Sequence, residues 1–288
     1  MIEKESSDFE WPEFDENTAS GLCYTSGTTG NPKGVLYSHR STVLHALIQC
    51  FYNSGSFAPK KKILPIVPLF HANAWGVPYS APISGTSLVF PGANLDGKSV
   101  YDLLEKYTVN SAWGVPTVWM GLLDEVAQRG GKKPDGLEEM LVGGSAAAKS
   151  LIEAFESLGV RVIHAWGMTE TSPLGTSGRL IPPFSDLPAE EQRHIQTSQG
   201  RKIFMVDLKI VDDNGKRLPE DGKSIGNLYI RGNTIAGGYY NNEEASKAAI
   251  DDEGYFGTGD VASIDGKGFL RLTDRAKDLI KSGGEWIS

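Results

Sequence analysis

The chain has 288 residues, a net charge of −8 and 40% hydrophobic residues, values typical of a globular protein with a buried core, which excludes disordered, collagen-like and coiled-coil chains. The acidic balance, with no Lys/Arg run longer than residues 60–62, argues against a nucleic-acid partner. No apolar stretch approaches the roughly 18 residues that span a bilayer, and the chain starts with polar, acidic residues, so we expect a cytoplasmic protein without a transmembrane segment.

Short β-rich runs alternate with amphipathic stretches between residues 20 and 164. Strands are predicted at residues 63–67, 87–90, 140–142 and 160–165. Apolar positions between residues 147 and 158 fall on one face of a predicted helix. This alternation predicts an α/β fold with a layered, mostly parallel sheet covered by helices.

The pattern changes after residue 182. Residues 183–199 are polar and predict a loop or short helix. Two β-hairpins follow, one joining residues 208–211 and 225–231, the other joining residues 261–264 and 269–272. We therefore predict an α/β region over residues 1–182 and a β-rich subdomain over residues 183–273.

A loop of small and hydroxylated residues at positions 24–34 is the strongest local signal. Small residues let backbone N–H groups reach phosphate oxygens, and a lysine adds a mobile positive charge. The loop is not a Walker A motif, because Pro32 precedes Lys33. A plain surface turn is the alternative. The candidate phosphate-binding residues are Thr25, Ser26, Gly27, Thr28, Thr29, Gly30 and Lys33.

Four further blocks follow in the order 143–146, 166–170, 257–260 and 274–285. With the phosphate loop, they resemble the signature of the adenylate-forming superfamily, which includes acyl-CoA synthetases, adenylation domains and luciferases. The blocks span nearly the whole chain. The resemblance implies the large N-terminal domain of such an enzyme, incomplete at both ends, with residues 274–288 as a hinge segment leading to a C-terminal domain absent from this chain.

The block at residues 166–170 follows a predicted strand, at the edge where open α/β sheets bind ligands. A flat ring there can stack on adenine, a hydroxyl can meet a phosphate, and a carboxylate can hold Mg²⁺. The resemblance assigns these roles to Trp166, Thr169 and Glu170, with Gly167 in the nucleotide site. Tryptophan at position 166 differs from the usual pattern of that superfamily, in which tyrosine is commoner at the stacking position.

Asp260 is expected in a loop between two β-like segments, where the resemblance makes it a ribose ligand. Arg275 would be a second ribose or phosphate contact, although each could be an ordinary surface charge. Lys277 matches the hinge. Gly144 and Ser145 would join the nucleotide site as part of a backbone wall.

His71 and Trp75 are four residues apart, so they can lie on one face if a helix begins near Ala72. The resemblance places the matching histidine beside the substrate carboxylate. We expect an acyl pocket formed by His71, Trp75, Gly143 and Gly144. The alternative is that His71 and Trp75 are ordinary residues of the hydrophobic core.

The resemblance implies a ligase with Thr169, Glu170 and His71 as catalytic residues. ATP and a carboxylic acid would give acyl-AMP, and CoA would then displace AMP, with Mg²⁺ on Glu170. The chain is most similar to medium-chain fatty-acid and 3-methylmercaptopropionate CoA ligases, and it stops before the family's catalytic lysine, so little activity is expected from it alone. A non-catalytic nucleotide-binding remnant and an adenylation domain for another acid stay open, as does a homodimer.

Overall fold

The structure is a computed structural model, which describes residues 6, 8–25, 31–275, 280–282 and 285–287, with side chains as far as residue 273. Within the described residues, one 11-stranded sheet has the order β10-β11-β12-β13-β9-β8-β7-β6-β5-β3-β4. Neighbouring strands are parallel from β7 to β4 and antiparallel from β7 to β10, so β7 joins the two parts of the sheet.

The parallel end of the sheet is built from β7 outward to β4. Each neighbouring pair from β7 to β4 is parallel, and the connections between these strands are helical. The predicted α/β region with a parallel sheet is thereby confirmed. The strands are β3 (Lys62–Pro65), β4 (Ser87–Leu88), β5 (Ser111–Gly114), β6 (Glu139–Val142) and β7 (Arg161–Gly167).

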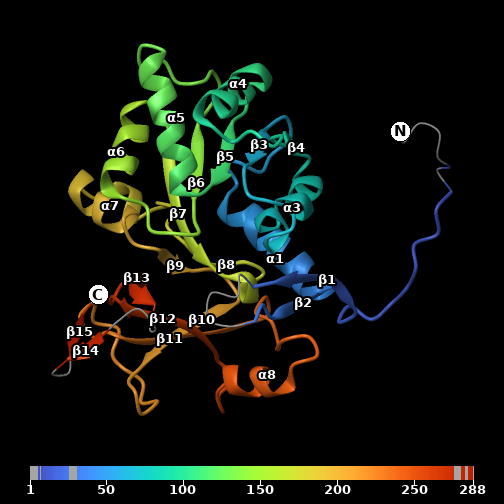
Figure 1. Cartoon of the computed structure of the whole chain (residues 1–288), viewed down its shortest axis with the longest axis vertical. Coiled ribbons are helices and arrows are strands. Elements are labelled where there is room, and N and C mark those ends of the chain that lie inside the picture. The colour runs from blue at the N-terminus through green and yellow to red at the C-terminus, as the bar shows by residue number, and fades with distance from the viewer. Residues whose placement is uncertain (1–5, 7, 26–30, 276–279, 283–284, 288) are drawn as a thin grey trace.

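Helices cover both faces of the parallel strands (Figure 1). Side chains alternate along a strand, so Trp113 and Leu141 face one layer while Ala112 and Met140 face the other. The first layer holds α1 (His39–Tyr52) and α3 (Val77–Ser84), and the second holds α4 (Gly97–Tyr107), α5 (Pro116–Gln128) and α6 (Lys149–Ser157). The predicted amphipathic helix at residues 147–158 is α6.

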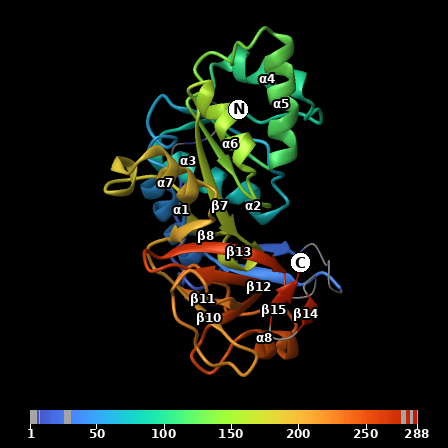
Figure 2. The ribbon, with the colours of Figure 1, turned by 90° about the vertical axis from the view of Figure 1, so that its left-hand side faces the viewer.

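The antiparallel end runs from β7 to β10 and lies beside the parallel end (Figure 2). Both predicted hairpins are present, because β10 pairs with β11 and β12 pairs with β13. One apolar core continues from the parallel strands into these strands. The division into domains stays a prediction. The strands are β8 (Leu174–Ser177), β9 (Gly200–Lys202), β10 (Val206–Val211), β11 (Gly226–Gly232), β12 (Phe256–Ile264) and β13 (Phe269–Arg275).

Shorter elements complete the fold. The polar stretch at residues 183–199 contains the 3-10 turn η3 (Phe184–Asp186) and α7 (Ala189–Gln196). No helix in the described part of the chain is long and apolar enough to cross a membrane. The others are β1 (Ala19–Tyr24), β2 (Gly34–Ser38), α2 (Ala72–Trp75), η2 (Thr169–Thr171), α8 (Glu243–Ala249), β14 (Ile280–Ser282) and β15 (Glu285–Ile287).

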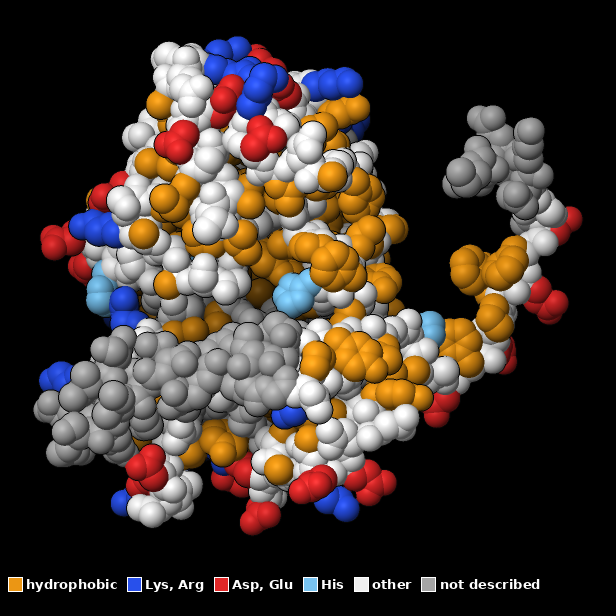
Figure 3. Space-filling view, viewed as in Figure 1, with side chains coloured by type: hydrophobic (Ala, Val, Ile, Leu, Met, Phe, Trp, Pro, Cys, Tyr) orange, Lys and Arg blue, Asp and Glu red, His pale blue; other side chains and the backbone are white. Residues whose placement is uncertain are grey.

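One face of the molecule carries exposed apolar side chains. They gather over β1, β2 and the α1/α3 layer (Figure 3). On α1, Val43, Leu47 and Phe51 are spaced four residues apart, so they form a stripe along one side of the helix. This layer therefore has an apolar inner side, which faces the sheet, and a partly apolar outer side.

Candidate active site

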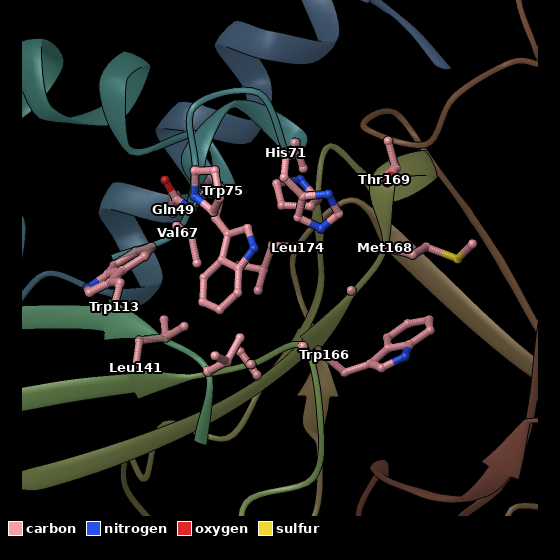
Figure 4. Close-up of a pocket in the computed structure, with 18 of the residues that line it drawn as sticks. Gln49, Val67, His71, Trp75, Trp113, Leu141, Trp166, Met168, Thr169 and Leu174 are labelled. Atoms are coloured by element: carbon pink, nitrogen blue, oxygen red, sulfur yellow. Dashed lines mark hydrogen bonds between the residues drawn. The ribbon is translucent and has the colours of Figure 1, made fainter. Parts of the chain in front are cut away.

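A cavity of about 270 Å³ lies where the parallel strands β5, β6 and β7 end. The carboxyl ends of parallel strands are the usual ligand-binding edge of an open α/β sheet. Most of the lining is apolar and comes from α1, the segment of residues 67–75 that follows β3, the ends of β5, β6 and β7 with the residues after them, and the start of β8 (Figure 4). Of the predicted site residues, His71, Trp75, Gly143, Gly144, Trp166, Gly167 and Thr169 line this cavity.

The segment that carries Trp75 differs from the predicted helix. Residues 72–75 have φ values of 46°, 53°, 49° and 57°, so α2 is a left-handed turn and the expected right-handed helical face is wrong. Such a turn costs about 1–2 kcal/mol per residue because Cβ approaches the following carbonyl oxygen. Gln49 stabilises the turn, since its Nε2 donates a hydrogen bond of 2.6 Å to the Trp75 carbonyl. The turn brings both His71 and Trp75 to the cavity.

Two glycines after β6 allow the Trp75 ring to approach the backbone. A Cβ atom added to Gly143 would lie 3.1 Å from the Trp75 ring, and Gly144 has a φ of +77°, which favours glycine. Small residues are therefore required here for a steric reason. Ser145 is exposed and lies outside the cavity lining.

The Trp166 indole is held at the edge of the cavity by Asp260. Its Nε1 donates a hydrogen bond of 3.0 Å to Asp260 Oδ2, and the ring leaves no room for a side chain on Gly175. Asp260 lies within strand β12 and not in a loop, so that expectation is wrong; Gly259, with a φ of +76°, turns the backbone beside it. The predicted adenine-stacking and ribose-binding residues are thus in direct contact.

The two ends of the predicted phosphate loop are closed by hydrogen bonds. Thr25 N donates to the Lys33 carbonyl at 2.9 Å, and Lys33 N donates to Thr25 Oγ1 at 3.0 Å. Residues 26–30, which include the predicted Ser26, Gly27, Thr28, Thr29 and Gly30, lie outside the described residues. The Lys33 ammonium lies 4.7 Å from the centre of the Tyr239 ring.

Two tyrosines, one buried (Tyr37) and one partly buried (Tyr239), hold the segment with Thr169 and Glu170. Tyr37 donates a hydrogen bond of 2.6 Å to the Thr169 carbonyl, and Tyr239 donates one of 2.7 Å to Glu170 Oε1. Burial, then the nearby charge of Glu170, raises the pKa of the Tyr239 phenol far above its usual value. The phenol therefore stays protonated and donates to the Glu170 carboxylate, which is only 4% exposed.

Comparison with known proteins identifies the family. Residues 2–240 match the model of the AMP-binding enzyme family. The chain therefore belongs to the AMP-binding enzymes. It is 51% identical over its whole length to a medium-chain-fatty-acid–CoA ligase of Ectopseudomonas oleovorans, covering 52% of that protein. It is 48% identical over its whole length to a 3-methylmercaptopropionyl-CoA ligase of Ruegeria lacuscaerulensis, covering 53% of that protein.

Solved structures of a CoA ligase and a CoA synthetase share the fold. An anthranilate CoA ligase in complex with anthranoyl-AMP matches with a TM-score of 0.83 and 26% identity, over 100% of this chain and 53% of that one. An O-succinylbenzoate CoA synthetase of Bacillus subtilis in complex with ATP and magnesium matches with a TM-score of 0.81 and 28% identity. The match covers 99% of this chain and 56% of that one. The chain thus spans about half the length of the relatives it matches.

The carboxylate of Glu170 fits the chemistry of a Mg²⁺ ligand. Mg²⁺ prefers hard oxygen donors and is usually held by one or two carboxylates together with substrate phosphates and water. Glu170 supplies such an oxygen, and its carboxylate is held in place by Tyr239. Outer partners of this kind fix the orientation of a metal ligand.

The remaining predicted residues lie at the end of the described chain. The backbone of Arg275 pairs with Asp260 across β12 and β13, which brings the two predicted ribose contacts to one place in the sheet. The side chain of Arg275 and the whole of Lys277 lie outside the described residues. Sequence reasoning missed Tyr37, Tyr239 and Gln49, whose contacts join segments far apart in the chain.

Proposed function

We propose that the complete protein is an ATP-dependent acid–thiol ligase that converts a fatty or short-to-medium-chain carboxylic acid into its CoA thioester. One observation carries the proposal. A single cavity is lined by the predicted acyl-pocket residues His71 and Trp75 and by the predicted nucleotide residues Trp166 and Thr169. A carboxylate in the cavity would therefore lie beside a nucleotide at its edge.

The reaction requires mainly positioning and charge neutralisation. A carboxylate oxygen attacks the α-phosphorus of ATP and pyrophosphate leaves; the CoA thiol then attacks the acyl carbonyl and AMP leaves. In this proposal Trp166 stacks on adenine, Asp260 binds the ribose, Thr169 contacts the α-phosphate, and Lys33 neutralises the phosphates. Mg²⁺, when bound at Glu170, supplies further charge neutralisation.

The cavity lining favours a simple acyl chain over an amino acid. An amino-acid adenylation site needs an acidic anchor for the substrate amine, and the described lining residues include no Asp or Glu. The names of the two relatives given above, a medium-chain fatty-acid ligase and a 3-methylmercaptopropionyl ligase, support the same substrate class. A cytoplasmic location and a homodimer stay predictions.

The test is acid-dependent release of pyrophosphate by the complete protein, with CoA thioesters detected by mass spectrometry. We expect release with straight-chain acids and a drop of about 100-fold in Glu170→Gln, which removes the metal-binding charge. Glu243→Gln on α8 is the matched control, because its side chain is 92% exposed. ATP binding without any acid-dependent release would instead support a non-catalytic nucleotide-binding module.

A further inference from the structure

The side of the cavity away from the predicted nucleotide residues is closed by a tryptophan. Figure 4 shows the Trp113 ring beside Leu141 on one side of the cavity, with Thr169 on the opposite side. Trp113 lies on β5 and its register partner Leu141 lies on β6. Phe57 packs edge-on against the Trp113 ring, with the ring centres 5.5 Å apart. Trp113 is only 1% exposed, so its ring forms a wall that protein surrounds on the other sides.

A buried polar cluster, made of Ser56, Ser111 and Glu139, lies beyond this wall. Ser111 and Glu139 precede Trp113 and Leu141 by two residues on the same strands, so they share one sheet face with them and lie roughly 7 Å nearer the amino ends. Trp113 Nε1 donates a hydrogen bond of 3.0 Å to Ser111 Oγ. Ser56 Oγ is hydrogen-bonded to Ser111 Oγ at 2.8 Å and to Glu139 Oε1. The indole is therefore connected through two serines to a buried carboxylate.

Two arginines fix the position of the Glu139 carboxylate. Arg161 Nη2 lies 3.3 Å and Arg179 Nη1 lies 3.8 Å from Glu139 Oε2. A buried charge that loses its partners is strongly unfavourable, so the carboxylate cannot readily move away from them. An alkyl chain offers neither a charge nor a hydrogen bond in return. The cluster is thus a rigid anchor for the indole and a place that an acyl chain cannot enter without disrupting buried polar contacts.

We propose that the cluster of Ser56, Ser111 and Glu139 limits the length of the acyl chain, because it holds the Trp113 ring in place at the end of the acyl pocket. This inference rests on the proposed function, in which the reacting carboxylate lies beside Thr169. An acid that fits in front of Trp113 gains about fourfold in kcat/KM for each methylene group that it buries. A longer acid has to displace the ring, which breaks the hydrogen bond to Ser111. The value of kcat/KM should therefore rise with chain length, reach a maximum and then fall.

The test measures kcat/KM for pyrophosphate release by the complete protein with straight-chain acids from butanoate to hexadecanoate. The readout is the preference ratio, which divides kcat/KM for the best acid by that for the acid two carbons longer. In Ser111→Ala the ring no longer has its hydrogen bond to the cluster, so this ratio should fall about 3- to 10-fold, the equivalent of one hydrogen bond. Ser56→Ala should lower the ratio as well, because it separates Ser111 from Glu139. Ser198→Ala is the matched control, since Ser198 is equally buried and hydrogen-bonded but belongs neither to the cavity lining nor to the cluster.

Trp113→Leu removes the ring itself, so the best acid should become longer. Trp119→Leu makes the same change in the helical layer on the opposite face of the sheet and should keep the wild-type optimum. Trp113→Phe, which retains a ring against Phe57, replaces Trp113→Leu if the latter does not fold.

Four results would overturn the inference. The first is a wild-type enzyme whose kcat/KM shows no maximum within this range of acids. The second is an unchanged preference ratio in Ser111→Ala or Ser56→Ala, and the third is an equal fall in Ser198→Ala. The fourth is an unchanged optimum in the Trp113 variant. Failure of the complete protein to activate any acid would instead refute the proposed function itself.

Discussion

Tyr239 is the hydrogen-bond partner of the Glu170 carboxylate, and Tyr239→Phe removes this bond while keeping the aromatic ring. The bond is 2.7 Å long, and Glu170 is only 4% exposed, so water cannot readily replace the phenol. A hydrogen bond to a charged group contributes about 1.5–3 kcal/mol. At about 1.4 kcal/mol for each factor of ten, we expect roughly a 10- to 100-fold weaker response to Mg²⁺, the range typical of residues that orient a metal ligand.

The assay is acid-dependent pyrophosphate release by the complete protein, titrated with Mg²⁺ at saturating ATP and followed by calorimetric titration with MgATP. Tyr239→Phe should raise the Mg²⁺ concentration that gives half-maximal activity and weaken MgATP binding. Tyr239→Leu should do more, because it also removes the ring that lies 4.7 Å from the Lys33 ammonium. Tyr240→Phe, at a half-exposed neighbour, is the control. The same Mg²⁺ dependence in wild type and Tyr239→Phe, within about twofold, would show that this hydrogen bond does not orient the metal-binding carboxylate.

Three further changes have defined outcomes. Trp166→Phe keeps a ring but loses the hydrogen bond to Asp260, so the KM for ATP should rise about 3- to 10-fold; an unchanged KM contradicts a role for that hydrogen bond in nucleotide binding. Burial lowers the pKa of His45 to about 3 and of His164 to about 4, so only the unfolded chain takes up protons as the pH falls below about 6.5. Stability should therefore decline from about pH 6.5 down to about pH 4 for His164 and about pH 3 for His45, by about 2 kcal/mol per histidine at pH 5. Urea unfolding at pH 7.5 and 5 measures the free energy of unfolding that is lost on acidification. His45→Gln should lose about half as much as wild type, and equal losses in the two proteins would contradict the role of buried His45. In Gly167→Ala the new Cβ would lie 1.7 Å from a carbonyl oxygen, so urea unfolding should show a loss of about 3 kcal/mol, and wild-type stability would contradict the observed packing.

The sequence predicted the parts of the molecule that depend on local pattern. Alternating strands and amphipathic helices predicted the parallel sheet and its helical layers, and turn residues predicted both hairpins. The order of the motif blocks predicted that Trp166, Thr169 and the glycines after β6 meet at one cavity, because each lies at or just after the end of a parallel strand and those strand ends meet at one edge.

Other features depend on contacts that no local pattern encodes. The left-handed turn at residues 72–75 consists of Ala, Asn, Ala and Trp, and only Asn among them favours that backbone, so tertiary contacts such as the Gln49 bond must support it. Tyr239 meets Glu170 across 69 residues of chain. Asp260 lies in a strand because β12 continues past the glycines that predicted a loop.

Exchange of labelled pyrophosphate into ATP reports whether the enzyme forms acyl-AMP, because the exchange needs no CoA. We expect the complete protein, with Mg²⁺ and a straight-chain carboxylic acid, to return label to ATP, and we expect omission of the acid to abolish the exchange. Binding of MgATP without exchange for any carboxylic acid would contradict the claim that this cavity activates carboxylates.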